Sequence, residues 1–446
     1  MTKTTVALLV IAFAMAHARE SAAQDVSWIR QFGTVRFDSA DSIATDADHA
    51  YAAGRVGFEQ ALFGQVSAGS VDTFVRKYEA EGGEVWTRQF GTSGFDGFPT
   101  IAVHASAVYV IGLTEGAFPG QVSAGGDDVF IRRYDVDGNE QWTRQLGTSG
   151  HEFVLDVAAH AGGVDVFGVT TGVFPGQAGA GGTDFFLARL DADANLLWVR
   201  QFGTSGNDPA IFTLGGVAVD ATGVYVGSTV SSALPEQAAL GGADAFLRKY
   251  DLAGNELWTT QFGTACRDIL SGVAVHAGGV YVTGSTTGRM SDPFFERCTN
   301  PPSPNNNFGD VPTAFVQKRA ADGAVAWTRQ YEGSSGPTGF SLGIELAVDG
   351  SGVYVASEAV RPRDPDAMSP ACPIDGPHED IHVRRYGLDG AEGWTRLIGS
   401  TQLDVPSDID TNADGVYVAA VTLCQLGEEP NAGSADAVVI KLTAEP

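Results

Sequence analysis

Hydrophobic and polar residues alternate in short segments along this chain, and the segments recur in groups of four. The fourth group has them at residues 216–220, 224–229, 244–251 and 256–262. Each segment has five to eight residues and is bounded by Gly, Asp or Asn, which is typical of β-strands joined by turns. No helical periodicity appears inside a group. The pattern predicts an all-β protein with four antiparallel strands in each repeat.

One phrase, Trp-Thr-Arg-Gln-Phe-Gly-Thr, marks the last segment of each repeat. All seven Trp residues of the chain lie in copies of it, and the last two copies are degenerate. The copies begin 56 to 69 residues apart, at Trp28, Trp86, Trp142, Trp198, Trp258, Trp327 and Trp394. A period of about 60 residues with four strands is typical of propeller blades, whereas helical solenoid repeats are shorter. We predict a single seven-bladed β-propeller at residues 24–446, with the Trp side chains packed between blades rather than stacked on a ligand.

The two ends of the chain complement each other. After Trp394 only three strand-like segments remain, at residues 407–412, 416–422 and 436–443. The missing fourth segment stands alone near the start of the chain, at residues 26–32, and carries Trp28. We predict that this N-terminal strand completes the last blade and closes the ring, which removes an exposed sheet edge.

The amino-acid sequences of the repeats are informative beyond their period. Units such as DAFLRKYDLAGNELWTTQFGT and GVAVDATGVYVGST resemble the bacterial β-propeller repeats known as SBBP, over essentially the whole mature chain. The resemblance implies architecture and export, and it supplies no catalytic residues. Repeats five and six depart from the pattern, with longer loops at 285–312 and 358–379. We expect individual function in those loops, because loops carry binding residues more often than the scaffold does.

The first 23 residues are expected to be an export signal. Lys3 is followed by an apolar run at residues 5–16 and by Ser21-Ala22-Ala23, with cleavage predicted after Ala23 or else Ala18. The apolar run is too short for a membrane span, so we expect a secreted or periplasmic, monomeric protein. The chain has 27 basic and 54 acidic residues, a net charge of −27, which argues against nucleic acid or anionic lipid as a partner.

Four cysteines lie in the C-terminal half of the chain. They are Cys266, Cys298, Cys372 and Cys424, all in loops expected on one face of the ring. Their wide spacing is unlike a zinc site, and an oxidising compartment favours disulfides. Of the three possible connectivities we favour Cys266 with Cys298 and Cys372 with Cys424.

Two polar patterns are compatible with metal binding, and each has a structural alternative. Acidic turns at residues 135–140 and 191–193 resemble the start of a calcium loop but are too short for one, so we expect hairpin turns and at most weak calcium binding. The innermost strands end at Asp46, His104, His160, Asp220, His276, Asp349 and Asn412. These residue types also cap tight turns, and we expect that role, with no metal or other cofactor.

Two groups of loop residues are binding candidates. Four repeats place an aromatic or Leu, a turn and a Gln between their second and third strands, including Phe63 and Gln65, Phe118 and Gln121, Phe174 and Gln177, and Leu234 and Gln237. They are either packing residues or a repeated pocket suited to a glycan. The longer loops contain Phe294, Phe295, Arg297, Arg361, Arg363 and His378. Aromatic residues and Arg are enriched at binding hot spots.

No complete catalytic motif occurs, and residues repeated around a ring belong to the scaffold. His151-Glu152 lacks the second His of a zinc protease, and Gly91 to Phe95 lacks the last Gly of a nucleophile elbow. We expect a secreted, non-enzymatic scaffold that binds an extracellular protein or glycan through its loop-rich face. The alternative is a lyase or hydrolase at the mouth of the central channel. Three or more convergent, non-repeated titratable groups there would favour the enzyme.

Overall fold

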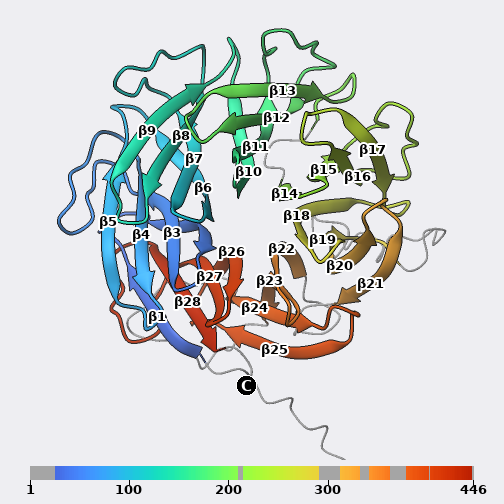
Figure 1. Ribbon diagram of the computed structural model, residues 1–446. Coiled ribbons are helices and arrows are strands. Elements are labelled where there is room, and N and C mark those ends of the chain that lie inside the picture. Colours follow the sequence, from blue (N-terminus) through green and yellow to red (C-terminus); the bar gives the residue numbers. More distant parts are fainter. Residues whose placement is uncertain are drawn as a thin grey trace, which may run out of the picture.

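The chain folds into a closed ring of seven four-stranded antiparallel sheets around a common axis (Figure 1). This computed structural model describes residues 26–208, 214–290, 312–331, 341–361, 378–400 and 402–443. The predicted seven-bladed β-propeller is confirmed. No helix long and apolar enough to cross a membrane occurs in these ranges.

The strands of each blade run from the axis outward in chain order, except in the last blade. Blades 1 to 4 contain β2 (Ser39–Thr45), β3 (His49–Val56), β4 (Asp72–Glu79), β5 (Glu84–Phe90); β6 (Asp96–His104), β7 (Ala107–Thr114), β8 (Asp128–Asp135), β9 (Glu140–Leu146); β10 (Glu152–His160), β11 (Gly163–Thr170), β12 (Asp184–Asp191), β13 (Leu196–Phe202); β14 (Gly216–Asp220), β15 (Gly223–Val230), β16 (Asp244–Tyr250), β17 (Glu256–Phe262). Blades 5 to 7 contain β18 (Asp268–His276), β19 (Gly279–Thr286), β20 (Thr313–Ala320), β21 (Val325–Tyr331); β22 (Ser341–Val348), β23 (Val353–Arg361), β24 (His378–Tyr386), β25 (Glu392–Ile398); β26 (Asp404–Asn412), β27 (Gly415–Thr422), β28 (Asp436–Thr443), β1 (Val26–Phe32).

The predicted segments match these strands, and the largest difference lies at the axis. The inner strand of blade 7 begins at Asp404, three residues before the predicted start. Most inner strands carry a β-bulge, as between Val154 and Asp156, where the pairing register shifts. A bulge inserts an unpaired residue and interrupts the alternation of side chains, so a pattern of period two detects only the part of the strand after it.

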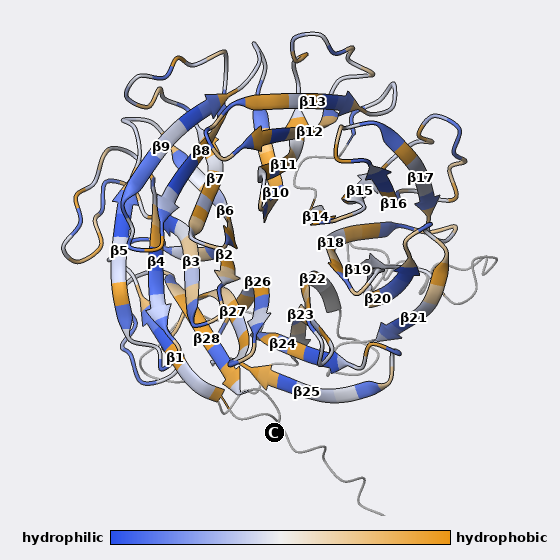
Figure 2. Ribbon diagram, viewed as in Figure 1, coloured by the Kyte–Doolittle hydropathy of each residue, from blue (hydrophilic) through white to orange (hydrophobic). Residues whose placement is uncertain are grey.

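Hydrophobic side chains fill the spaces between neighbouring blades. One cluster joins Phe185 of blade 3 to Phe246 of blade 4, whose ring centroids lie 5.0 Å apart. In Figure 2 the second strand β7 is rich in hydrophobic residues, whereas the outer strand β9 is largely hydrophilic. The cores therefore lie between sheets, and the ring is held by the contact of each blade with the next.

The N-terminal strand closes the ring as predicted. β1 pairs antiparallel with β28, from Val26 opposite Leu442 to Phe32 opposite Ala437. Trp28 is buried and contacts Tyr78 of blade 1 and Tyr417 of blade 7, at centroid distances of 5.7 and 6.1 Å. The two ends of the chain are thus tied into one blade, and that blade has the same four strands as the others.

The repeated Trp residues join consecutive blades by hydrogen bonds as well as by packing. In six of them the indole Nε1 donates to a backbone carbonyl in the hairpin between the third and fourth strands of the next blade. The bonds run from Trp28 to Ala80, Trp86 to Val136, Trp142 to Ala192, Trp198 to Leu252, Trp258 to Ala321 and Trp327 to Leu388.

Trp394 is the exception, and it faces the closing blade. Its Nε1 is buried and has no acceptor among the described residues, and the same holds for the Nε of Arg396. The blade that follows Trp394 is the closing blade, whose third and fourth strands, β28 and β1, come from opposite ends of the chain. The residue equivalent to Ala80 in this blade is Ala444, which lies outside the described residues.

This difference predicts unequal effects of one substitution at two positions. Trp86→Phe loses an inter-blade hydrogen bond of about 1 kcal/mol as well as packing, whereas Trp394→Phe removes a buried donor without a partner. We expect Trp86→Phe to lower the free energy of unfolding by roughly 1 kcal/mol more than Trp394→Phe, measured by urea denaturation. Equal losses would contradict the assigned role of the indole Nε1.

Candidate functional site

The inner strands surround a polar cavity of about 210 Å³ on the propeller axis. Six of the seven blades contribute lining residues, among them the carboxyl groups of Asp156, Glu345, Asp408 and Asp410. The first three occupy the same place in their blades, directly after the bulge of the inner strand. Ser42, Thr100 and Gly272 hold that place in blades 1, 2 and 5. The carboxyl groups at this position therefore break the repeat.

Two of the carboxylates at this position join neighbouring blades at their inner edge, and Asp410 of blade 7 does the same by accepting the Thr45 amide and hydroxyl of blade 1. Oδ2 of Asp408 in blade 7 accepts hydrogen bonds from Ser42 Oγ (2.7 Å) and the Ile43 amide (2.8 Å) in blade 1. Oδ2 of Asp156 in blade 3 accepts one from the Val217 amide of blade 4 (2.7 Å). Inner strands of adjacent blades share no ladder, so these bonds satisfy amides that face the axis.

Glu345 differs from the other two because no described hydrogen bond joins its side chain to another blade. Its Oε1 accepts only the neighbouring Leu346 amide (3.0 Å). The side chain extends over blade 5 at Gly272, where an added Cβ would lie 2.0 Å from Oε1. The glycine therefore gives Glu345 the room to reach across the channel.

The channel favours the neutral form of its acids. Burial raises the pKa of Asp156 and Asp408 to about 7 and that of Asp410 to about 6. Burial also raises the pKa of Glu345 well above its ordinary value, and the charges of Asp156 and Asp408 add to the effect. A raised pKa of this kind is found in acid–base catalysts as well as in buried scaffold acids.

Five of the seven residues that end the inner strands cap turns. Oδ1 of Asp46 accepts the amides of Asp48 and His49, and Oδ1 of Asp220 accepts those of Thr222 and Gly223. Asp349 and Asn412 bond amides of their own turns in the same way, and so does the His160 ring. Within the described ranges, no three His, Cys, Asp or Glu side chains are placed to hold a metal ion.

The acidic turns are also hairpin caps. Both oxygens of Asp135 accept hydrogen bonds, Oδ1 from the amides of Asp137 and Asn139 and Oδ2 from the side chains of Asn139 and Gln141. Asp191 binds Asn195 in the same way. These contacts lower the pKa of both exposed aspartates, the side-chain and backbone hydrogen bonds to Asn being the main cause.

A second cavity, of about 380 Å³, lies on the face that carries the loops entering each blade, here called the entry face. The entry loops of blades 1 and 2 and the loops between second and third strands of blades 7 and 1 meet there, joined by isolated bridges such as Val71 to Phe95. The lining residues, which define the entry-face cavity, are Arg36, Phe37, Arg55, Gly57, Phe58, Val71, Phe95 and Ser434. Phe37 and Phe58 are about half exposed, at 48% and 52%.

Aromatic and basic side chains continue from this cavity toward the axis. The Arg55 guanidinium lies 4.2 Å from the Phe98 ring centroid and pairs with Asp41 at 2.7 Å. Phe98 contacts Phe95 at 5.5 Å and Phe153 at 5.3 Å. Its backbone φ is +51°, a left-handed conformation that is uncommon for a bulky residue, within the bulge of β6. The bulge places an extra aromatic ring beside Arg55 and the two other phenylalanines.

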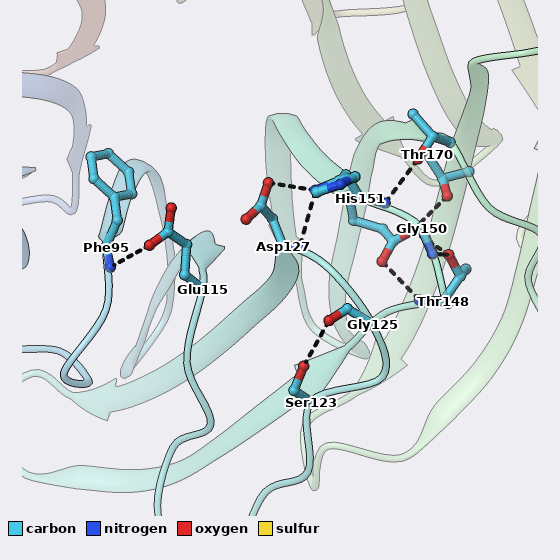
Figure 3. Close-up of polar contacts among 11 residues, drawn as sticks. Phe95, Glu115, Ser123, Gly125, Asp127, Thr148, Gly150, His151 and Thr170 are labelled. Carbon is cyan, nitrogen blue, oxygen red and sulfur yellow. Dashed lines mark hydrogen bonds and ion pairs between the residues drawn. The ribbon is translucent and has the colours of Figure 1, made fainter.

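The next blades present polar groups at the corresponding places, as Figure 3 shows. The Phe95 amide donates to Glu115 (3.2 Å). In blade 3 the equivalent of Phe95 is His151, whose ring contacts the Asp127 carboxylate at 2.8 Å and is 66% exposed. Among the blades whose entry loops are described, only blades 1 and 2 have an aromatic residue at the position of Phe95.

The repeated loop residues proposed from the sequence serve packing. Phe118 and Phe174 are buried between blades, and Oε1 of Gln121 and Gln177 accepts the amides of Gln145 and Gln201. In blade 1 the buried place belongs to Leu62, while Phe63 is fully exposed, so the alignment of Phe63 with Phe118 was wrong by one residue. These loops offer a ligand little aromatic surface.

The other predicted site residues cannot be placed. Phe294, Phe295, Arg297, Arg363, Cys298 and Cys372 lie outside the described residues, and so do the side chains of Arg361 and His378. Cys266 and Cys424 are buried on the entry face, and neither is a free thiol. The pairing of the four cysteines stays a prediction, as does the signal peptide at residues 1–23, which also lies outside.

Comparison with known proteins supports the fold and assigns no function. No protein-family model matches the chain, so the resemblance to SBBP repeats stays a prediction. The regulatory protein FlaEY of Caulobacter vibrioides is 24% identical over 324 residues, which are 64% of this chain and 32% of FlaEY. The chain thus spans about a third of that relative's length.

Solved propeller structures share the general architecture at low identity. BamB from Moraxella catarrhalis is 15% identical, with a TM-score of 0.43 over 92% of this chain and 99% of BamB. The WD40 propeller domain of Doa1 is 9% identical, with a TM-score of 0.47 over 94% of this chain and 97% of that chain. Similarity at this level concerns the fold alone.

The channel acids predict a pH-dependent effect of Glu345→Gln. An acid whose pKa is raised in the folded state destabilises that state as pH rises above the unfolded-state pKa, and the loss levels off above the folded-state pKa. At pH 5, close to the unfolded-state pKa of a glutamate, little of this loss has developed, so the amide changes little. At pH 8 the variant avoids a buried charge, and we expect its stability relative to the parent to rise by about 1 kcal/mol.

Urea unfolding at both pH values measures this difference. Glu429→Gln, in an exposed loop, is the control and should behave alike at pH 5 and pH 8. A Glu345→Gln variant that is equally destabilised at both pH values would show that the carboxylate is held by favourable contacts instead.

Proposed function

We propose that this chain is an exported, non-enzymatic scaffold that binds another protein at the entry-face cavity over blades 1 and 2. The observation that supports this most is the gathering of non-repeated aromatic and basic side chains around one apolar hollow. Phe37 and Phe95 occupy equivalent positions before a buried acid, where blades 3 to 5 have His151, Asn207 and Arg267 and blade 7 has Leu403. A residue that departs from the repeat does not make the contacts that all blades share.

The exposed rings are the main argument for a binding surface. Burying a half-exposed Phe against a partner is favourable by roughly 1 kcal/mol. The exposed part of the ring adds nothing to the stability of the isolated protein. Neighbouring arginines strengthen such a patch, because the guanidinium stacks on aromatic rings and bonds carboxylates. Arg55 is held over Phe98 by Asp41 and is therefore already oriented.

The chemistry of the lining favours a protein partner over a glycan. A sugar presents hydroxyl groups over most of its surface, and each needs a polar partner when it is buried. The cavity offers mainly carbon atoms from Phe37, Phe58 and Phe95. Arg36 is exposed and belongs to no ion pair within the described ranges. The preferred ligand is a protein segment with an apolar side chain for the hollow and a carboxylate for Arg36.

Hydrolysis in the channel is a second candidate, favoured by one observation. Asp156, Glu345 and Asp408 converge on the channel and replace the residues found in other blades, and burial raises the pKa of all three, which meets the criterion set out for an enzyme. Two of them fasten blades together, so Glu345 is the best placed to act as a general acid or base. If the parent protein has a hydrolytic activity and a folded Glu345→Gln variant lacks it, this result would support the second candidate.

Substitutions in the cavity test the binding proposal. The partner is first captured from the native secretome and purified, and its affinity is then measured by calorimetry. Phe37→Asn and Phe95→Asn copy the residue that blade 4 has at Asn207, and we expect each to weaken binding at least tenfold without loss of fold. Leu257→Asn, on the outer strand β17 and similarly exposed at 52%, is the matched control. Equal affinity in all variants would refute this site.

A further inference from the structure

One buried carboxyl group connects the two loops that form a large part of the entry-face cavity. Asp38 is fully buried at the end of the entry loop of blade 1, directly before β2. Its Oδ1 accepts the Gly57 amide at 2.9 Å, and its Oδ2 accepts the amide and, at 2.8 Å, the hydroxyl of Thr34. Gly57 lines the cavity at the start of the loop between the second and third strands. The carboxylate thus ties one wall of the cavity to the other.

The two walls are in direct contact at this point. A Cβ built on Gly57 would lie 2.4 Å from the Cβ of Arg36 and 2.8 Å from the carbonyl oxygen of Phe37. Gly57 is followed by Phe58, whose half-exposed ring lines the cavity together with that of Phe37. The place of the Gly57 backbone therefore helps to set how far apart the two rings lie.

The turn that carries Phe58 is strained. Glu59 has a backbone φ of +54°, a left-handed conformation that is uncommon for a residue with a side chain. Its amide donates to the Ser70 carbonyl at 2.7 Å. A strained turn persists only where the surrounding contacts hold it. Loss of the bond from Gly57 to Asp38 would therefore allow the turn to relax.

This tie replaces a contact that other blades make with a hydroxyl group. In blades 3 and 7 the second strand ends with a Thr, and the hydroxyl groups of Thr170 and Thr422 donate to the buried acids of those blades at 2.6 and 2.5 Å. The corresponding residue of blade 1 is Val56, which has no hydroxyl, and the Gly57 amide donates instead. A hydroxyl group both donates and accepts, whereas an amide N–H only donates.

Asp38 can hold both walls only while it is ionised. A protonated carboxyl group has an O–H on one oxygen, and that oxygen cannot face an amide donor. Asp38 would then lose the amide of either Gly57 or Thr34, and in each case one wall loses a backbone tie. Burial raises the pKa of Asp38, and the charge of Asp436 adds to the effect. Asp38 is therefore protonated at a higher pH than an exposed aspartate.

The other charged groups around Asp38 come from three elements. Arg55 of β3 is held in its own ion pair, and the side chains of Arg36 and Glu59 are exposed. Asp436 faces Asp38 from β28 of blade 7, and its Oδ1 is buried without a hydrogen-bond partner. A proton on this atom would leave Asp38 ionised and both ties intact, so the amides report which of the two acids is protonated.

We propose that the ionised Asp38 carboxylate keeps the entry-face cavity in its binding form, and that mild acid opens the cavity and releases the bound protein. The proposal rests on the binding function proposed above for this cavity. When Asp38 takes up a proton, one wall loses its tie, the turn with Phe58 relaxes and the apolar hollow loses its shape. At neutral pH the carboxylate restores both ties.

Amide resonances of the partner-free protein test the tie. In ¹⁵N–¹H correlation spectra recorded from pH 7 to pH 4, the Gly57 and Thr34 amides should shift with one common midpoint, above that of an exposed aspartate. Asp38→Asn should abolish this titration. Glu152→Gln, at the equivalent acid of blade 3, is the matched control and should leave it unchanged. Amides that do not shift, or that shift equally in Asp38→Asn, would overturn the proposal.

Val56→Thr is a second variant, which copies blades 3 and 7 and keeps the tie testable if Asp38→Asn does not fold. The added hydroxyl donates to the ionised carboxylate and favours that form, so the midpoint should fall. An unchanged midpoint in a folded Val56→Thr variant would contradict the assigned role of Asp38.

Affinity for the purified partner tests the release. The parent should bind at least tenfold more weakly at pH 5 than at pH 7, and Asp38→Asn should bind weakly at both. An equal loss with pH in both proteins would show that acid acts elsewhere and would overturn the release. If the amides do not titrate while Phe37→Asn still weakens binding, the regulation alone fails. If Phe37→Asn leaves the affinity unchanged, the binding function fails, and the release fails with it.

Discussion

Neighbouring blades of this propeller share no continuous hydrogen-bonded ladder, so the ring depends on the side chains that join one blade to the next. The repeated phrase supplies them. Its Trp donates to the following blade, its Arg reaches a glycine carbonyl there, as Arg88 does at Gly138, and its Gln bonds the first acid of the third strand. Its Gly leaves room for two acids. The phrase recurs because each junction needs the same set of contacts.

Function on such a scaffold is expected where the repeat is broken. The channel acids Asp156, Glu345 and Asp408 replace Ser, Thr and Gly at one position of the ring. Phe37 and Phe95 make two of the blades aromatic on the entry face. The two groups differ in what they offer. The acids are partly engaged in holding blades together, while Phe37 and Phe58 on the entry face are about half exposed, which is why the entry face is the stronger binding candidate.

The sequence predicted the architecture well, because strand periodicity and a repeated Trp are local signals. The closing strand was predicted from the unpaired segments at the two ends. The channel acids were missed because a bulge before Asp156 interrupts the alternation that assigns faces. The buried acids that meet at a blade junction, such as Asp72 and Asp96, were missed because they are separated along the chain, and each alone is an ordinary turn residue. Only the register of two blades brings Asp72 and Asp96 together. The alignment of the short loops was wrong at Phe63, because Leu62 takes the buried place in that blade.

The central claim is that the side chains of the repeated phrase join each blade to the next. Urea unfolding of the Arg88→Ala variant tests this most directly, because the Arg88 Nε donates to the Gly138 carbonyl of the following blade. The account predicts that the variant loses about 1.5 kcal/mol or more of the free energy of unfolding. An unchanged free energy of unfolding would contradict it.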